Sequence, residues 1–332
     1  MTAPTVDEIA RLFAQMELAP PDQPGVLRRR LRADLRHLDI HVEVALPERT
    51  RALVVTAADA VDDQQLLNTA GLTCSTHGGT VRVQAEPNVE AELFCTLVAD
   101  LVHHAGTAAV QPTAALVHRI RCWQKMLAAG LNTGLSAQAQ LGLFGELVAL
   151  REIALPAWGP AALQAWVGPT GAPQDFRYGR AALEVKCVSY RDPEHCRISN
   201  ERQLDTADID LLCLVHQSVR SGFDGGVTLP EIIDAVRADP ALVGYRLLLE
   251  ERLLHAGWLD VHRHQYVRER YGLTARRCYR VVPGFPRLTS RDVPTGVRSV
   301  SYSVELDQCA PFLLTERDLA QLLRQHTPEE VP

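Results

Sequence analysis

The sequence predicts an α/β fold in which a mixed sheet is flanked by helices. Apolar runs with helical spacing alternate along the chain with short runs typical of strands. Residues 209–217 are nearly all apolar, as expected of a strand that is buried on both faces. Glu184 and Lys186 interrupt a second apolar strand, predicted at residues 181–189. Both side chains project from one face of that strand, and a charged pair in such a place needs a chemical explanation.

The chain has 332 residues, enough for more than one domain, and its predicted elements group into three parts. Residues 1–125 are predicted to form an N-terminal α+β domain that acts as a scaffold or in recognition, because nothing in it indicates chemistry. Its strands are predicted at residues 40–46, 51–55 and 80–85, and its amphipathic helix at residues 89–104.

The second part, residues 126–220, opens with a long helix. Ser136 is a good N-cap for a helix over residues 137–155, and Pro156 with the segment 158–160 is expected to end it.

Two glycines, Gly142 and Gly145, lie inside this predicted helix, where they cost stability unless close packing requires them. Close packing of the helix on a sheet would bring Glu146 towards the strand ends. We therefore expect Glu146 to lie near the charged pair.

The predicted sheet continues after a loop rich in glycine and proline. A strand begins at Asp175, Gly179 makes a turn, and the strand of Glu184 and Lys186 follows. Eight residues separate Asp175 from Glu184, which suits a short hairpin. Three carboxylates and one ammonium group are thus expected to converge, and a divalent metal held by the carboxylates explains their presence.

Lysine is rare in this chain. Lys125 and Lys186 are the two lysines, and every other basic residue except histidine is arginine. Because lysine is a compact donor with a tunable pKa, its use at position 186 indicates a chemical demand there.

The third part, residues 221–332, is predicted to be a C-terminal α+β extension that packs on the core. Helices are expected at residues 229–238 and 244–256, and strands at residues 279–282 and 299–304.

Composition narrows the functional classes. No apolar run approaches the length of a membrane span, and the first residues lack a signal-peptide pattern, so we expect a cytoplasmic protein without a membrane partner. The eight cysteines are scattered, which favours reduced, mostly buried thiols. The formal net charge of −6 does not indicate a strongly basic nucleic-acid binder.

The order of these motifs resembles a known superfamily. A helix with Glu146, then Asp175, then Glu184-Val185-Lys186 on successive strands is similar to the core of the PD-(D/E)XK nucleases, which include many restriction endonucleases. More narrowly, the chain resembles the prokaryotic proteins called PD-(D/E)XK motif proteins, often encoded in restriction and phage-defence clusters. The segments that carry this likeness are residues 141–147, 174–176, 184–186, 203–204, 285–288 and 300–302. One departure is Gln174, which precedes Asp175 where the motif has proline.

The resemblance implies a restriction-endonuclease-like core and a Mg²⁺-dependent endonuclease that hydrolyses DNA, with Mn²⁺ as a substitute ion. Asp175 and Glu184 would supply carboxylate ligands, and the backbone carbonyl of Val185 another. Glu146 would complete a second metal site or hold a metal-bound water.

The basic and amide groups have separate expected roles. Lys186 would orient the attacking water or stabilise developing charge, and Gln203 would orient the phosphate or a carboxylate. A capped surface turn is the other interpretation of Gln203.

Two other functions stay open at this point. One is an inactive nuclease-like subunit that binds DNA or a partner in a defence complex. The other is a carboxylate–metal enzyme that acts on small substrates. The expected partners are DNA and other proteins of a restriction or defence system, and a homodimer is also open.

Overall fold

We describe the protein from a computed structural model. The described residues are 4–18, 25–32, 38–57, 71–87, 89–107, 112–128, 134–190 and 195–326. The chain divides into two compact units, residues 1–133 and 134–332, and each is described by itself. The predicted boundary near residue 125 falls inside a helix of the first unit, and residues 221–332 share the second unit with residues 134–220.

The first unit is a five-stranded antiparallel sheet with three helices in its described residues. The sheet order is β1-β2-β3-β5-β4. Apolar side chains of β2 and of the helices share one core, in which Phe13 of α1 lies 5.9 Å from Phe94 of α2 between ring centroids. The elements are α1 (Val6–Glu17), β1 (Gly25–Arg32), β2 (Leu38–Leu46), β3 (Thr50–Ala57), β4 (Leu72–His77), β5 (Thr80–Ala85), α2 (Ala91–Thr107) and α3 (Pro112–Ala128).

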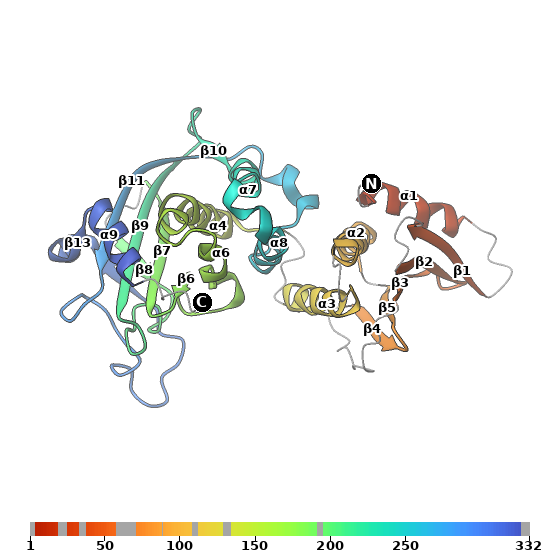
Figure 1. The fold of residues 1–332 in the computed structure, drawn as a ribbon, viewed down its shortest axis with the longest axis horizontal. Helices are drawn as coiled ribbons and strands as arrows, with labels where there is room; N and C mark the ends of the chain where they lie inside the picture. Colours follow the sequence, from red (N-terminus) through yellow and green to blue (C-terminus); the bar gives the residue numbers. More distant parts are fainter. Residues whose placement is uncertain are drawn as a thin grey trace. The chain divides into compact units, whose positions relative to one another are not determined.

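The second unit is built around a mixed sheet in the order β10-β11-β9-β7-β6, with β13 paired to β11 (Figure 1). Strands β7 and β9 are parallel, and the other pairs of this sheet are antiparallel. Helix α4 packs on β7. The α-helices of the second unit are α4 (Ala137–Ala149), α5 (Leu155–Trp158), α6 (Ala161–Ala165), α7 (Leu229–Arg237), α8 (Arg246–His255) and α9 (Glu316–Gln325). Its strands are β6 (Phe176–Tyr178), β7 (Ala181–Ser189), β8 (His195–Ile198), β9 (Leu211–Ser221), β10 (Val227–Thr228), β11 (Arg270–Arg280), β12 (Tyr302–Glu305) and β13 (Leu313–Leu314).

The predicted α/β class with a mixed sheet and flanking helices is confirmed. The strand predicted at residues 181–189 is β7, and that predicted at residues 209–217 is β9, which extends to Ser221. Differences occur in the third part. The strand predicted at residues 279–282 overlaps the end of a much longer β11, and the strand predicted at residues 299–304 is β12, which begins at Tyr302.

The predicted helix after Ser136 is present, and the segment 158–160 ends it as predicted, but Pro156 does not. Ser136 caps α4 by accepting a hydrogen bond from Ala139 N at 3.2 Å. Proline lacks the N–H that an α-helix needs. The chain passes Pro156 through a π-helical turn, Leu150–Ala154, in which the Leu155 N–H bonds to Leu150 O. The helical path ends at Gly159, within the predicted segment 158–160, and the φ of Gly159 is +59°.

Close packing explains one of the two helical glycines. A Cβ atom at Gly145 would lie 2.4 Å from the Cβ of Cys187 on β7, so only glycine allows this approach of helix and strand. A Cβ atom at Gly142 would meet nothing within 4 Å. The close-packing prediction is therefore confirmed for Gly145 and wrong for Gly142.

The two faces of the sheet in the second unit have different neighbours. Leu183, Val185 and Val215 face the core that contains α4 and α7. Ala182 and Leu214 face a smaller core that includes Cys196 and Ile198 of β8 and residues of β12. Strands β8 and β12 pair as a two-stranded ribbon on that second face.

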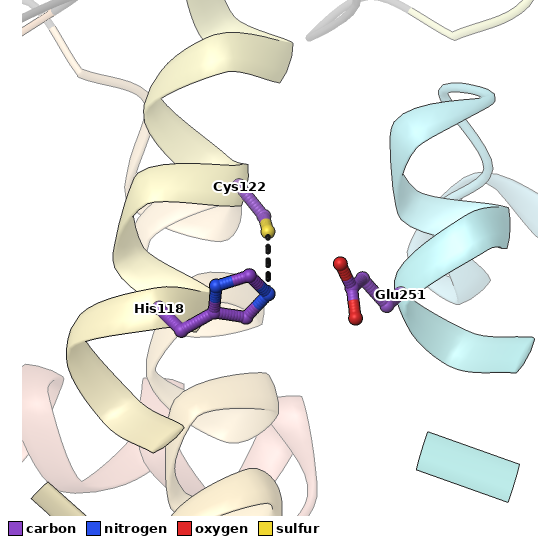
Figure 2. A group of neighbouring side chains, drawn as sticks. All are labelled: His118, Cys122 and Glu251. Atoms are coloured by element: carbon purple, nitrogen blue, oxygen red, sulfur yellow. Dashed lines mark hydrogen bonds between the residues drawn. The ribbon is translucent and has the colours of Figure 1, made fainter. Parts of the chain in front are cut away.

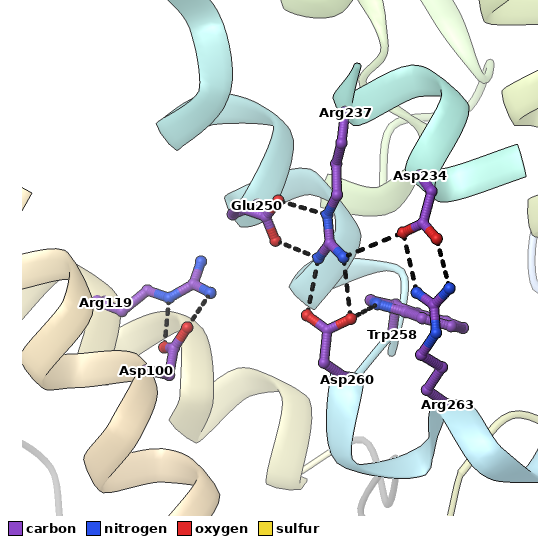
Figure 3. Close-up of polar contacts among 8 residues, drawn as sticks. All are labelled: Asp100, Arg119, Asp234, Arg237, Glu250, Trp258, Asp260 and Arg263. Atoms are coloured by element: carbon purple, nitrogen blue, oxygen red, sulfur yellow. Dashed lines mark hydrogen bonds and ion pairs between the residues drawn. The ribbon is translucent and has the colours of Figure 1, made fainter. Parts of the chain in front are cut away.

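Ion pairs connect elements within each unit (Figure 3). In the first unit, Arg119 of α3 donates two hydrogen bonds of 2.7 Å to Asp100 of α2. In the second unit, Arg237 of α7 donates to Glu250 of α8 at 2.8 Å and 2.7 Å, and to Asp260 at 2.9 Å and 2.8 Å. These contacts fix neighbouring elements to one another within each unit.

No described helix combines the length and the apolar character that crossing a membrane requires.

Candidate active site

The five predicted site residues come from four places in the second unit. Glu146 lies on α4, Asp175 directly precedes β6, Glu184 and Lys186 lie on β7, and Gln203 lies in the turn after β8. Because Phe176 pairs with Leu183, the alternation of the strands places Asp175 on the same face as Glu184. We call Glu146, Asp175, Glu184 and Lys186 the carboxylate cluster.

Glu184 is the buried centre of this cluster. Its side chain is 1% exposed, and Lys186 Nζ lies 2.7 Å from its Oε1. Neither of its carboxylate oxygens has a hydrogen bond of good geometry from the described residues. A buried carboxylate in this state is costly unless a further partner binds it.

Gln203 contacts the lysine of the cluster. Its Oε1 accepts hydrogen bonds from Lys186 Nζ at 3.0 Å and from Ser199 N at 2.8 Å. The turn that carries Gln203 is held by Gln174, whose buried amide donates to the carbonyl oxygen of Arg202 at 2.8 Å. Gln174, which stands where the motif has proline, therefore anchors the Gln203 turn to the Asp175 segment.

The backbone around Asp175 fixes its carboxylate. Val185 N donates to Asp175 Oδ2 at 2.7 Å. The amides of Val167 and Gly168 each donate to the carbonyl oxygen of Asp175 at 2.9 Å. A Cβ atom at Gly168 would lie 2.9 Å from Asp175 Oδ1, so a side chain at residue 168 would displace this oxygen.

Trp166 holds Glu146. The fully buried indole donates from Nε1 to Glu146 Oε2 at 2.7 Å. The backbone of Trp166 forms a bridge with Phe176, the residue after Asp175. The short segment from Trp166 to Gly168 thus positions two acidic residues. The Trp166 indole holds the Glu146 carboxylate, and the Val167 and Gly168 amides hold the Asp175 backbone.

Burial raises the pKa values of all three carboxylates, and repulsion by Asp175 adds to it at Glu146 and Glu184. Burial, with the charge of Asp175, raises the pKa of Glu146 to about 8, although the Trp166 bond and Lys186 act in the other direction. Burial raises the pKa of Asp175 to about 6 against the hydrogen bond from Val185 N and the charge of Lys186. Burial and the Asp175 charge raise the pKa of Glu184 well above its ordinary value.

Lys186 stays an ammonium group. Burial lowers its pKa, but the adjacent Glu184 carboxylate outweighs burial, and the pKa lies above its ordinary value. Ionisation of all three carboxylates beside one ammonium would leave an excess of negative charge in the cluster, which a bound cation would offset.

The residues of the cluster fit a divalent cation. Carboxylate oxygens are the ligands that Mg²⁺ and Mn²⁺ prefer. Both oxygens of Glu184 are buried, Lys186 pairs with Oε1 while Oε2 has no hydrogen-bond partner among the described residues, and the charge of Asp175 disfavours ionisation of Glu184. Asp175 and Glu184 would hold the ion, with Glu146 and the Val185 carbonyl as further oxygen donors.

Sequence reasoning missed Trp166, Gly168 and Gln174 as supports of the site. The loop rich in glycine and proline indicated irregular backbone, but it did not indicate that this backbone positions the side chains of the candidate site. A weak signal exists for Trp166 because buried tryptophan needs a partner for its N–H.

A second pair of ligand-type side chains lies in the first unit. Figure 2 shows His118 and Cys122 one turn apart on α3, with the Cys122 sulfur 3.7 Å from His118 Nε2. Glu251, also drawn in Figure 2, belongs to α8 of the second unit and is not counted with them. Among the first unit's described residues, this pair does not supply the four ligands of a structural zinc site.

Comparison with known proteins gives one match. The family model DUF4420, whose description reads "Putative PD-(D/E)XK family member", matches residues 9–307. No curated protein and no solved structure matches the chain at a significant level. The matched range includes the whole carboxylate cluster and Gln203.

Proposed function

Because the chain belongs to the DUF4420 family, we propose that it is a metal-dependent nuclease with a restriction-endonuclease-like core, which hydrolyses DNA phosphodiester bonds. One observation carries the proposal. Asp175, Glu184 and Lys186 converge on one sheet face, and the buried Glu184 has Lys186 beside Oε1 but no hydrogen-bond partner for Oε2 among the described residues. Fold resemblance alone does not fix a reaction, so the argument depends on these groups.

Mg²⁺ is the proposed cofactor, with Mn²⁺ as a substitute. When bound, the ion supplies positive charge opposite the phosphate and a more acidic water. Asp175 and Glu184 bind the ion, and the Val185 amide keeps the Asp175 carboxylate in a fixed orientation.

Lys186 has the second proposed role. Glu184 and Gln203 each contact its Nζ, which fixes the ammonium beside the carboxylates. The ammonium has three N–H donors, so one donor remains to orient the attacking water or to stabilise charge on a phosphate oxygen. Glu146, held by Trp166, binds a second ion or a water at the edge of the cluster.

We also propose that the protein acts in restriction or phage defence with partner proteins. Its net charge of −6 favours modest intrinsic affinity for DNA, since non-specific binding depends on neutralisation of phosphates by basic groups. Partners would supply affinity or a recognition sequence.

The test is cleavage of modified and unmodified DNA with Mg²⁺, with and without partner proteins. Lys186→Ala should lose cleavage and keep DNA binding. Lys186→Arg should also be poor, because the planar guanidinium does not replace a compact ammonium. Lys125→Ala, which changes the other lysine of the chain, is the matched control and should cleave as wild type.

Two results would contradict the mechanism. Cleavage by Lys186→Ala at the wild-type rate would remove the proposed role of the lysine. Tight DNA binding by the wild type, without cleavage under any of these conditions, would favour the inactive DNA-binding subunit.

A further inference from the structure

The sheet face that carries Glu184 and Lys186 extends beyond Lys186. On β7 and β9 the even-numbered side chains share this face, because Ala182 and Leu214 pack with β8 while odd-numbered neighbours face α4. The ribbon of β8 and β12 covers the Ala182 end of the face. At the Lys186 end, the even positions of β9 are His216, Ser218 and Arg220.

Three side chains form a row across the strands at the level of the lysine. Lys186 of β7 is in register with His216 of β9, and His216 with Arg277 of β11. At about 4.8 Å per strand, Arg277 lies roughly 10 Å from Lys186 between Cα atoms. Arg277 is exposed, whereas His216 is 1% exposed, and burial together with the Arg277 charge lowers its pKa to about 4. The row therefore has two cations separated by a neutral imidazole.

An aromatic side chain lies at the far end of this face. Tyr190 follows β7 and is held to β9 by a hydrogen bond from its N–H to Val219 O at 2.7 Å. The guanidinium carbon of Arg220 lies 5.4 Å from the centre of its ring. Tyr190 is nevertheless 51% exposed. Four residues along a strand place it roughly 13 Å from Lys186.

We propose that this part of the face, formed by Tyr190, Arg220 and Arg277 beside Lys186, binds an unpaired strand of nucleic acid next to the reacting phosphate. Tyr190 stacks on a base, and Arg220 and Arg277 contact phosphates. The inference rests on the proposed nuclease function and specifies the form of its substrate.

Charge and shape favour this occupant. Apart from Glu184, the even positions of β7 and β9 in the described residues carry no acidic side chain, while Lys186, Arg220 and Arg277 carry three positive charges. An exposed ring supported by a guanidinium offers a π-face to a base. A base inside a duplex has both faces covered by its neighbours, so a ring at this position selects an unpaired nucleotide.

The first experiment measures binding without metal and without cleavage. Fluorescence anisotropy in EDTA would compare a single-stranded oligonucleotide of about 20 nucleotides, longer than a typical site of about 4–16, with its duplex. Wild type should prefer the single strand. Tyr190→Ala should weaken single-strand binding about tenfold, and Tyr190→Phe should retain it, because stacking needs the ring and not the hydroxyl.

The second experiment identifies the phosphate contacts. Arg220→Ala and Arg277→Ala should each reduce the slope of log affinity against log salt by about 0.7 on the single strand. Arg317→Ala is the control, because Arg317 is exposed on α9, whose Leu319 and Leu323 pack in the core on the opposite face. It should leave the slope unchanged.

The results separate this inference from the nuclease proposal. Equal or tighter binding of the duplex, or unchanged single-strand binding by Tyr190→Ala, overturns the inference and leaves the metal site untouched. Failure of the carboxylate cluster to bind Mg²⁺ or Mn²⁺ overturns the nuclease proposal and leaves the binding measurements in EDTA unaffected.

Discussion

Glu43 and Glu184 are both carboxylates buried in a sheet, one in each unit, but their surroundings are opposite. Glu43 of β2 is 2% exposed and accepts hydrogen bonds from Arg28, with 2.7 Å from Nε to Oε1, and from Arg82. Burial raises the pKa of Glu43, but the bonds from Arg82 and Arg28 outweigh burial and lower it below its ordinary value. Glu184 is equally buried, has one lysine beside it, and its pKa is raised.

The difference is the one expected between a structural carboxylate and a proposed metal ligand. The guanidinium groups of Arg28 and Arg82 satisfy both oxygens of Glu43, so neither oxygen is available as a metal ligand. Glu184 has one ammonium at Oε1 and no hydrogen-bond partner at Oε2 among the described residues, and it shares its surroundings with two further carboxylates. Burial alone therefore does not distinguish the two carboxylates, whereas the number of partners that satisfy their oxygens does.

The largest expected effect is on cleavage. Glu184→Gln should reduce the cleavage rate by about 10³-fold or more, because a lost metal ligand removes several kcal/mol of charge stabilisation. Glu43→Gln removes a charge of the same type from the other sheet and should leave the rate unchanged. Single-turnover cleavage with excess Mg²⁺ measures both. Similar cleavage rates for Glu184→Gln and Glu43→Gln would contradict a functional difference between the two carboxylates.

A smaller effect is expected from the support of Glu146. Trp166→Phe removes the indole N–H and should lower Mg²⁺ affinity about tenfold, as expected for a group that orients a ligand. Because the Trp166 bond lowers the pKa of Glu146, the pH dependence of binding should also shift to higher pH.

The control for this variant is Trp158→Phe. Trp158 is a buried tryptophan of the same unit, and its indole donates to Leu323 O at 3.2 Å. Loss of affinity without a shift in the pH profile, or an equal loss in Trp158→Phe, would reduce Trp166 to a packing residue.

Glu43 should matter for stability instead. Glu43→Gln weakens two charge-assisted hydrogen bonds, and we expect a loss of about 2 kcal/mol in the free energy of unfolding. Since the folded pKa of Glu43 is lowered, its contribution is present above its unfolded pKa and is lost as the pH falls through the folded pKa. Urea denaturation of wild type and variant at neutral and acidic pH measures this. A difference that grows towards acidic pH would contradict it.

The smallest expected effect is on the stability of the metal-free protein. The folded pKa values of Asp175 and Glu146 are raised to about 6 and about 8, so the folded state holds more protons than the unfolded chain. The contribution of these groups to the free energy of unfolding is therefore fully present below their unfolded pKa values, and it is lost as the pH rises towards 8. Glu146→Gln should raise the melting temperature above pH 8 and leave it unchanged near pH 4. A melting temperature that is equally changed at both pH values would contradict the pKa assignment.

The sequence predicted the parts of the site that follow local rules. Alternation along β7 placed Glu184 and Lys186 on one face, and the helical glycine Gly145 indicated close packing that is observed against Cys187. It could not predict contacts made by irregular backbone. Trp166 reaches Glu146 across twenty residues, and Gln174 reaches the Gln203 turn across nearly thirty.

The path through Pro156 shows another limit. The missing N–H of proline forbids one α-helical bond but does not decide between ending a helix and widening it. Tertiary packing decides, since Trp158, two residues beyond the proline, is buried in the core of the second unit.

Calorimetric titration of the metal-free protein with Mn²⁺, above the Glu146 pKa of about 8, tests the central claim most directly. The carboxylate cluster is predicted to bind the ion in wild type and in Glu43→Gln. Binding should be lost in Asp175→Ala, which removes both a ligand and a negative charge. Equal affinity of wild type and Asp175→Ala for the ion would contradict the account.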